Sequence, residues 1–108
     1  MKKFIIDNTD IKLGENAQEN WDITFNANPE HIWIHLTHYP SGHLVIEDHN
    51  PSFSTINRCA EICKQYSKCK NMKHIKYSET RCKNLLKGDK IGEVEFISHR
   101  KVKDNVII

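Results

Sequence analysis

The stretch "HIWIHLTHYPSGHLVIEDH", residues 31–49, contains two runs in which apolar and polar side chains alternate. One side of the first run is aliphatic and consists of Ile32, Ile34 and Leu36. One side of the second run is also aliphatic and consists of Leu44 and Ile46. Alternation with a period of two is typical of a β-strand with one buried face. The intervening "HYPSG" suits a hairpin with a longer loop. The sequence therefore predicts a β-hairpin whose aliphatic face packs on the core.

The opposite face of this hairpin contains Trp33, His35 and His43. Residues on one face of paired strands are cross-strand neighbours, so we expect these three rings to lie close together. An exposed strand face of this kind favours nucleic acid, because bases stack on aromatic rings and imidazoles hydrogen-bond to phosphate or sugar. Local hydrogen bonding that holds the hairpin together is the simpler alternative.

Histidines also suit metal binding and acid–base catalysis. His35, His43 and Glu47 make a two-histidine, one-carboxylate set conceivable, but no further ligand converges on that face. His35 with Thr37 forms one H-x-[ST] motif, and the second motif that a symmetric phosphoesterase site needs is missing. We therefore expect no metal, no cofactor and no catalysis. An RNA-processing or RNA-modifying enzyme with His35 and His43 as acid and base, or as metal ligands, stays open as an alternative.

Periodicity predicts the rest of the fold. The apolar side chains between residues 53 and 67 recur every three or four positions, which predicts one amphipathic helix that Ser52 or Ser54 can cap. Residues 15–25 form a short helix or an irregular turn. Short strands are expected in "KKFII", "DIKLG", "HIKYS", "GEVEFI" and "VKDNVII". The prediction is a single α+β domain over residues 1–108, with a mostly antiparallel sheet and one main helix at about 53–67.

Composition limits the location of the protein. Apolar residues make up 38% of the chain and charged residues 28%, and no window approaches the length of a membrane span. Too few apolar residues precede Asp7 for a signal peptide, so we expect a cytoplasmic protein without membrane contact. The four cysteines lack a C-x2-C pair, so free thiols are expected and not a zinc site.

Charge is distributed unevenly along the chain. Residues 1–57 contain three lysines and eight acidic residues, for a net charge of −5. Residues 58–90 contain ten lysines and arginines and three acidic residues, for a net charge of +7. Such asymmetry indicates either a surface that meets a polyanion or a solvated lysine-rich segment.

Five segments of the chain follow one another in the order of a known domain family. They are "GENAQENWD" (14–22), "IWIHLTHYPSGHLVI" (32–46), "YSKCK" (66–70), "IKYS" (75–78) and "CKNLLKGDKIGEV" (82–94). Together they resemble the NFACT RNA-binding domain. That domain is best known from the C-terminal part of the ribosome-quality-control factors that extend stalled nascent chains, and it also occurs alone. The resemblance covers nearly the whole chain from residue 11 onward, and it implies an α+β fold that binds RNA.

The resemblance also implies particular site residues. The family's characteristic polar positions fall on Asn16, Asn20, His35 and His43, and on Ser67 with Lys68. Its basic segment falls on Arg81 and Lys83, with Gly88 and Gly92 in the turn that follows.

These observations together predict a non-catalytic RNA-binding domain that contacts tRNA or ribosomal RNA, in translation or ribosome-associated quality control. We expect Lys68, Lys70, Lys73, Arg81 and Lys83 to neutralise phosphates. His35, His43, Asn16 and Asn20 are expected to form a polar pocket beside Trp33, with Ser67 at its edge. A DNA ligand and an adaptor that docks on the ribosome remain open, and the sequence does not determine the oligomeric state.

Overall fold

The hairpin at residues 31–49 forms the centre of the domain. The computed structural model describes all residues from 1 to 108, and in it β3 (Ile32–Leu36) pairs antiparallel with β4 (Leu44–Ile46). The register places Ile34 opposite Leu44 and Trp33 opposite Val45. The hairpin is therefore confirmed.

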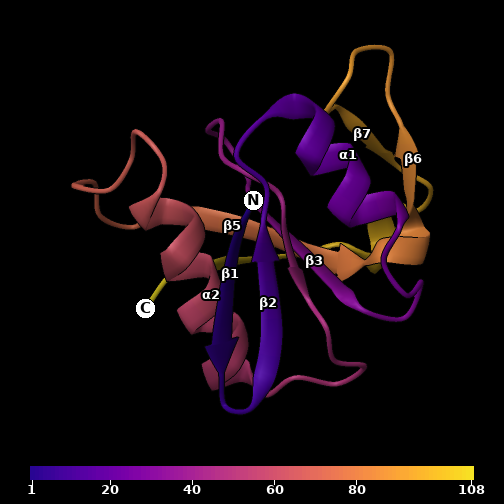
Figure 1. Cartoon of the computed structure of the whole chain (residues 1–108). Coiled ribbons are helices and arrows are strands. Elements are labelled where there is room, and N and C mark those ends of the chain that lie inside the picture. Colours follow the sequence, from indigo (N-terminus) through magenta and orange to yellow (C-terminus); the bar gives the residue numbers. More distant parts are fainter.

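Four further strands extend the hairpin into a six-stranded antiparallel sheet of order β1-β2-β4-β3-β5-β8 (Figure 1). β1 (Lys2–Ile6) and β2 (Thr9–Leu13) are joined by a tight turn in which Asp7 and Asn8 both have positive φ, as a two-residue hairpin loop requires. β5 (Lys76–Arg81) pairs with β3, and β8 (Lys103–Val106) pairs with β5 to complete the sheet.

One face of the sheet packs against the main helix, α2 (Phe53–Gln65). The aliphatic side chains of the central hairpin lie on this face with Ile11, Leu13 and Tyr77. Cys59, Ala60 and Cys63 of α2 pack against them. We call this the inner face, and it contains the main core.

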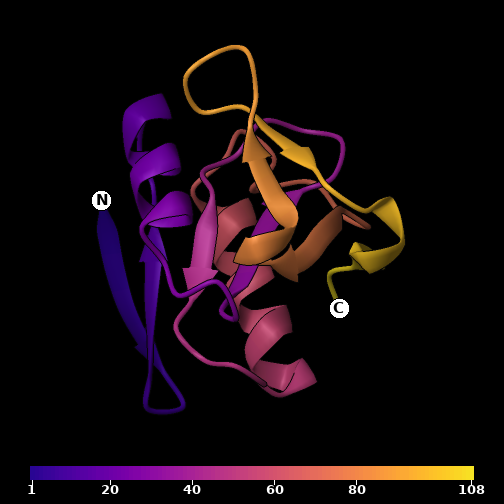
Figure 2. The same ribbon diagram turned by 90° about the vertical axis from the view of Figure 1, so that its right-hand side faces the viewer.

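The opposite, outer face is partly covered by α1 (Ala17–Phe25) and by a small sheet of β6 (Leu85–Lys87) and β7 (Val94–Phe96). Figure 2 looks onto this small hairpin, drawn in orange, with the yellow segment that leads into β8 beside it. A second apolar cluster lies beneath the cover, with Trp33 and Val45 from the sheet, Ile23 from α1, and Cys82 and Leu85 from the segment at β6.

The predicted architecture is confirmed as an α+β domain with an antiparallel sheet and a main helix over residues 53–65. Residues 17–25 are helical, so the segment for which a short helix or an irregular turn was expected forms the helix. The short strand β6 was not predicted. All four cysteines are buried free thiols, and burial raises the pKa values of Cys59 and Cys82 to about 12. None of the helices has the length and apolar character needed to cross a membrane.

Candidate functional site

A cleft of about 600 Å³ opens on the outer face between the sheet and the β6–β7 hairpin. Trp33, His35 and His43 line it, so the three rings that the sequence placed together do share one site. The rings of His35 and His43 lie 5.1 Å apart in an edge-to-face arrangement. Further lining comes from Thr37, directly after β3, and from strands and turns distant in sequence, which supply Ser78, Phe96, His99 and Asp104.

His43 is held by hydrogen bonds from three directions. Its backbone N–H donates to Asn20 Oδ1 at 3.1 Å, and its carbonyl accepts from the Gly14 N–H at 3.0 Å. In the side chain, Nδ1 accepts a hydrogen bond from the indole N–H of Trp33 at 3.1 Å. The hydroxyl oxygen of Thr24 lies 3.4 Å from the same Nδ1 atom. Because an indole N–H can only donate, Nδ1 of His43 must be unprotonated and the ring proton must lie on Nε2. The neutral tautomer of this histidine is thereby fixed.

Burial and charge act on His43 in the same direction. Only 4% of the residue is exposed, and desolvation followed by the proximity of His35 lowers its pKa from 6.5 to about 3. The pKa of half-buried His35 is also lowered, mainly by burial, while the Leu36 and Ser41 carbonyls oppose that shift. At neutral pH this site therefore presents a neutral hydrogen-bond donor on His43 and lacks the imidazolium that a general acid would need.

The expectation of an exposed His/Trp face is wrong. Trp33 is only 2% exposed, because Phe96 of β7 packs edge-on against its indole at a centroid distance of 5.8 Å. The His35 ring stacks parallel to the same indole, also at 5.8 Å. Trp33 is thus a buried side chain against which the rings of His35 and His43 pack. The more accessible aromatic surface of the cleft comes from Phe96 and His99.

Two of the predicted polar residues do not join the histidines in this cleft. Asn16 caps α1 by accepting from the Glu19 N–H at 2.9 Å, which explains why the position is polar. Ser67 closes the turn after α2, since its hydroxyl donates to the Lys64 carbonyl at 2.7 Å and accepts from the Cys69 N–H at 3.0 Å. Asn20 takes part indirectly, by fixing the backbone of His43.

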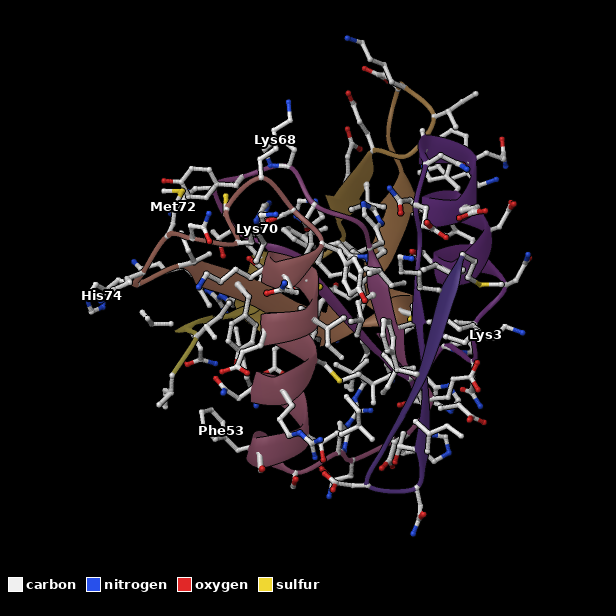
Figure 3. All side chains as sticks on the ribbon, turned by 60° about the vertical axis from the view of Figure 1, so that its left-hand side comes forward. Lys3, Phe53, Lys68, Lys70, Met72 and His74 are labelled. Atoms are coloured by element: carbon white, nitrogen blue, oxygen red, sulfur yellow. The ribbon has the colours of Figure 1, made fainter.

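The lysines after α2 form the strongest unpaired charge of the molecule. Lys68, Lys70, Lys73 and Lys76 are exposed and form no ion pair, and no acidic residue occurs between positions 62 and 78. We call these four residues the basic loop. Figure 3 shows Lys68 and Lys70 projecting from this segment, on the side of the molecule away from Lys3.

Two residues of the basic loop lie near the cleft. Lys68 lines a neighbouring depression of about 430 Å³ together with Asn20, Ser41 and Gly42, directly beside His43 in the chain. Lys76 lies two residues before Ser78 on β5, so both side chains point to the outer face. The charge and the cleft therefore adjoin.

Arg81 and Lys83 lie apart from the basic loop, so the predicted basic residues fall into two groups. Arg81 is the last residue of β5, about 17 Å from Lys76 at the usual rise per residue, and Lys83 follows in the next turn. Lys83 Nζ contacts Glu30 Oε1 at 2.6 Å, and the Arg81 guanidinium donates to the carbonyls of Glu30 and His49. These contacts lower the pKa of Glu30, chiefly through its hydrogen bond to Lys83. Both cations are thus engaged within the chain.

Sequence reasoning missed Ser78, Asp104, Phe96 and His99. Thr37 was noticed only as half of a motif. The alternation in "IKYSETR" could have placed Ser78 on the same face as Lys76. Nothing local identifies Asp104, because its role depends on the pairing of β5 with β8. No group of three or more histidine, cysteine, aspartate or glutamate side chains is arranged to hold a metal ion.

The fold is also found in the C-terminal part of a larger protein. The chain superposes with a TM-score of 0.87 and 26% identity on the C-terminal structure of the fibronectin/fibrinogen-binding protein from Streptococcus suis. The match covers 97% of this chain and 43% of that one.

In sequence, the chain is similar to the Rqc2 homolog RqcH of Bacillus subtilis (strain 168). The two are 30% identical over 95 residues, which is 85% of this chain and 17% of RqcH. The chain thus spans about a sixth of that relative's length. RqcH is a member of the NFACT family, which is the family that the sequence motifs of this chain resemble. No family model matches the sequence.

Proposed function

We propose that this chain is a non-catalytic RNA-binding domain that contacts tRNA or ribosomal RNA in the cytoplasm. The observation that carries the proposal is the basic loop, four exposed lysines without ion pairs, of which Lys68 lines the depression next to the aromatic-lined cleft. Phosphates are the natural partners of such unpaired lysines, and nucleic acid supplies them at regular spacing. The similarity to RqcH and the NFACT resemblance support a role at the ribosome, in quality control of translation.

The properties of the two histidines support binding more than catalysis. A general base works best with a pKa near the operating pH, and His43 has a pKa of about 3. His35 donates its Nδ1 proton to the Leu36 carbonyl, since a carbonyl can only accept. Burial lowers the pKa of both histidines, so at neutral pH both rings act as neutral hydrogen-bonding groups in a wall of the cleft.

The first test removes two lysines of the basic loop. Lys68→Ala combined with Lys70→Ala should weaken binding to tRNA and to single-stranded RNA of any sequence. Each lost phosphate contact should reduce the slope of log affinity against log salt by about 0.7 for a single strand, so the pair should reduce it by about 1.4. A salt titration by fluorescence anisotropy measures both quantities.

Lys3→Ala is the matched control for Lys70→Ala. Both are exposed lysines without ion pairs, and they lie on opposite sides of the molecule (Figure 3). If binding responds only to net charge, the two single variants will weaken it equally, and the basic loop is then not the contact surface.

A protein partner is the second candidate, and two observations favour it. The Streptococcus suis protein is named for binding fibronectin and fibrinogen, and exposed Tyr66 and Met72 accompany the lysines of the basic loop in this chain. Co-sedimentation with ribosomes before and after nuclease treatment separates the alternatives. Association that survives complete RNA digestion would indicate a protein contact and overturn the RNA proposal.

A further inference from the structure

One row of polar side chains crosses four neighbouring strands in the floor of the cleft. The register pairs His35 with Ser78 and Ser78 with Asp104. Ile34 pairs with Leu44, so His43 lies opposite His35 at the other end of the row. With about 4.8 Å between strands, the row from His43 to Asp104 spans about 14 Å. The cleft of about 600 Å³ above it is within the usual range for small-molecule sites.

The Asp104 end of the row offers only hydrogen-bond acceptors. Ser78 donates its hydroxyl proton to Asp104 Oδ1 at 2.6 Å. Thr37 lies 2.9 Å from the same Ser78 oxygen and must be the donor there, because the only proton of Ser78 is already used. The chain of bonds therefore runs from Thr37 to Ser78 to Asp104, and the carboxylate Oδ2 remains free. A carboxylate at this place repels a phosphate and attracts a hydroxyl or an N–H group.

The His43 end offers a donor. Nδ1 accepts from Trp33, so Nε2 bears the proton, and Nε2 forms no hydrogen bond within the chain. Tyr77 Oη is the only fully enclosed side-chain N or O atom that lacks a partner, so Nε2 must retain access to the cleft that His43 lines. A residue that is only 4% exposed thus directs an unused N–H group into the site.

Aromatic surface lies beside this donor. Phe96 is half-buried and contacts Trp33 edge-on, and the exposed ring of His99 packs against Phe96 at a centroid distance of 5.6 Å. Such a wall suits a flat ring inserted with its edge toward His43. The site therefore combines a donor and an aromatic wall at one end with a carboxylate about 14 Å away.

We propose that the cleft binds one unpaired ribonucleoside of an RNA strand. The base lies against Phe96 and accepts a hydrogen bond from His43 Nε2–H, and the ribose 2′-hydroxyl donates to Asp104. The flanking phosphates then point out of the cleft toward Lys68 and Lys76. This inference rests on the proposed function, and it adds a reason for the domain to prefer RNA to DNA, since only RNA has the 2′-hydroxyl.

The test uses an oligouridylate of about eight residues and its 2′-deoxy counterpart, which differ only at the 2′ position. The wild type should bind the RNA more tightly. Asp104→Asn should weaken RNA binding about tenfold, as expected for loss of one hydrogen bond to a charged group. It should strengthen DNA binding only slightly, to the same extent as the loss of one exposed negative charge elsewhere. The asparagine Oδ1 can still accept from Ser78, so the fold should be retained.

Glu95→Gln is the matched control. Glu95 is exposed on β7 outside the cleft, and the change removes one negative charge just as Asp104→Asn does. Asp104→Asn would overturn the proposal if it strengthened the binding of both oligonucleotides, as Glu95→Gln is expected to do. Equal binding of the two oligonucleotides by the wild type would also overturn it.

A spectroscopic measurement tests the other end of the row. The indole N–H of Trp33 donates to His43, so the NMR signal of this N–H should shift when a base accepts a hydrogen bond from His43 Nε2. The chain has two tryptophans, and Trp21→Phe identifies which indole signal belongs to Trp33. RNA binding that leaves the Trp33 signal unmoved would overturn the cleft proposal alone. Failure of the wild type to bind either oligonucleotide would overturn the proposed function as well.

Discussion

His43 shows how one residue can determine the chemistry of a site without an exposed side chain. Asn20 and Gly14 fix its backbone, and Trp33 fixes its tautomer. Gly14 has to be glycine for this arrangement, because a Cβ there would lie 2.1 Å from the Asn20 Oδ1 that accepts from the His43 N–H. The donor in the cleft is therefore determined by residues on α1, β3 and the end of β2.

The lowered pKa of His43 should make the protein less stable in acid. The folded state holds this ring neutral down to about pH 3, whereas the unfolded chain takes up a proton near pH 6.5. The unfolded state therefore binds more protons between these values, and the free energy of unfolding should fall by about 1.4 kcal/mol per pH unit below 6.5. His35, whose pKa is also lowered, should steepen this loss.

Urea denaturation at pH 7, 6 and 5 measures this slope. His43→Gln should make the slope shallower, and His38→Gln, at an exposed position, serves as the control. A wild-type stability that does not change over this range would contradict the buried neutral state of His43.

At the scale of elements, α2 shows how much a sequence pattern can determine. The apolar stripe predicted the helix and its buried face, and Cys59, Ala60 and Cys63 do pack on the sheet. The choice between two possible caps depended on geometry. Ser52 is the cap, because its hydroxyl accepts from the Thr55 N–H at 3.2 Å.

Ser52→Ala should therefore reduce the free energy of unfolding by about 1 kcal/mol. Ser54→Ala is the matched control, since Ser54 is an exposed serine in the first turn of the same helix. Thermal denaturation of both variants measures the difference. Equal effects of the two changes would rule out a special role for the cap.

The outer cover of the sheet could not be predicted in the same way. Alternation in residues 31–37 correctly placed Trp33 and His35 away from the aliphatic face, but it does not say what packs above them. Phe96 reaches Trp33 only because β7 folds back over the sheet from more than 60 positions later in the chain, a long-range contact that no local pattern encodes. The predicted exposure of Trp33 failed for this reason.

At the scale of the whole molecule, the positive charge divides into two regions with different surroundings. The sequence showed one basic segment from residue 58 to 90, but β5 crosses the domain within that segment and separates its ends. The basic loop at one end is unpaired. At the other end, Arg81 joins the chain before β3 to the chain after β4 through the carbonyls of Glu30 and His49.

Arg81→Ala should accordingly lower stability, by about 1 kcal/mol, more than it changes RNA binding. The salt slope of RNA binding should change less than in the Lys68→Ala/Lys70→Ala variant. Lys83→Ala, which removes only an exposed ion pair with Glu30, should have little effect on stability. Thermal denaturation and a salt titration measure the two effects, and a large loss of salt dependence in Arg81→Ala would extend the contact surface to this end of β5.

The row of polar residues in the cleft also has a consequence for the order of events during synthesis. The β1–β2 and β3–β4 hairpins pair residues that are near in sequence, so they can form as soon as they leave the ribosome. The pairing of β3 with β5, and then of β5 with β8, needs closure of long loops. A chain translated only as far as β5 therefore lacks Asp104, the residue that we propose to contact the ribose. The proposed ability to distinguish RNA from DNA should then appear only once β8 has paired with β5.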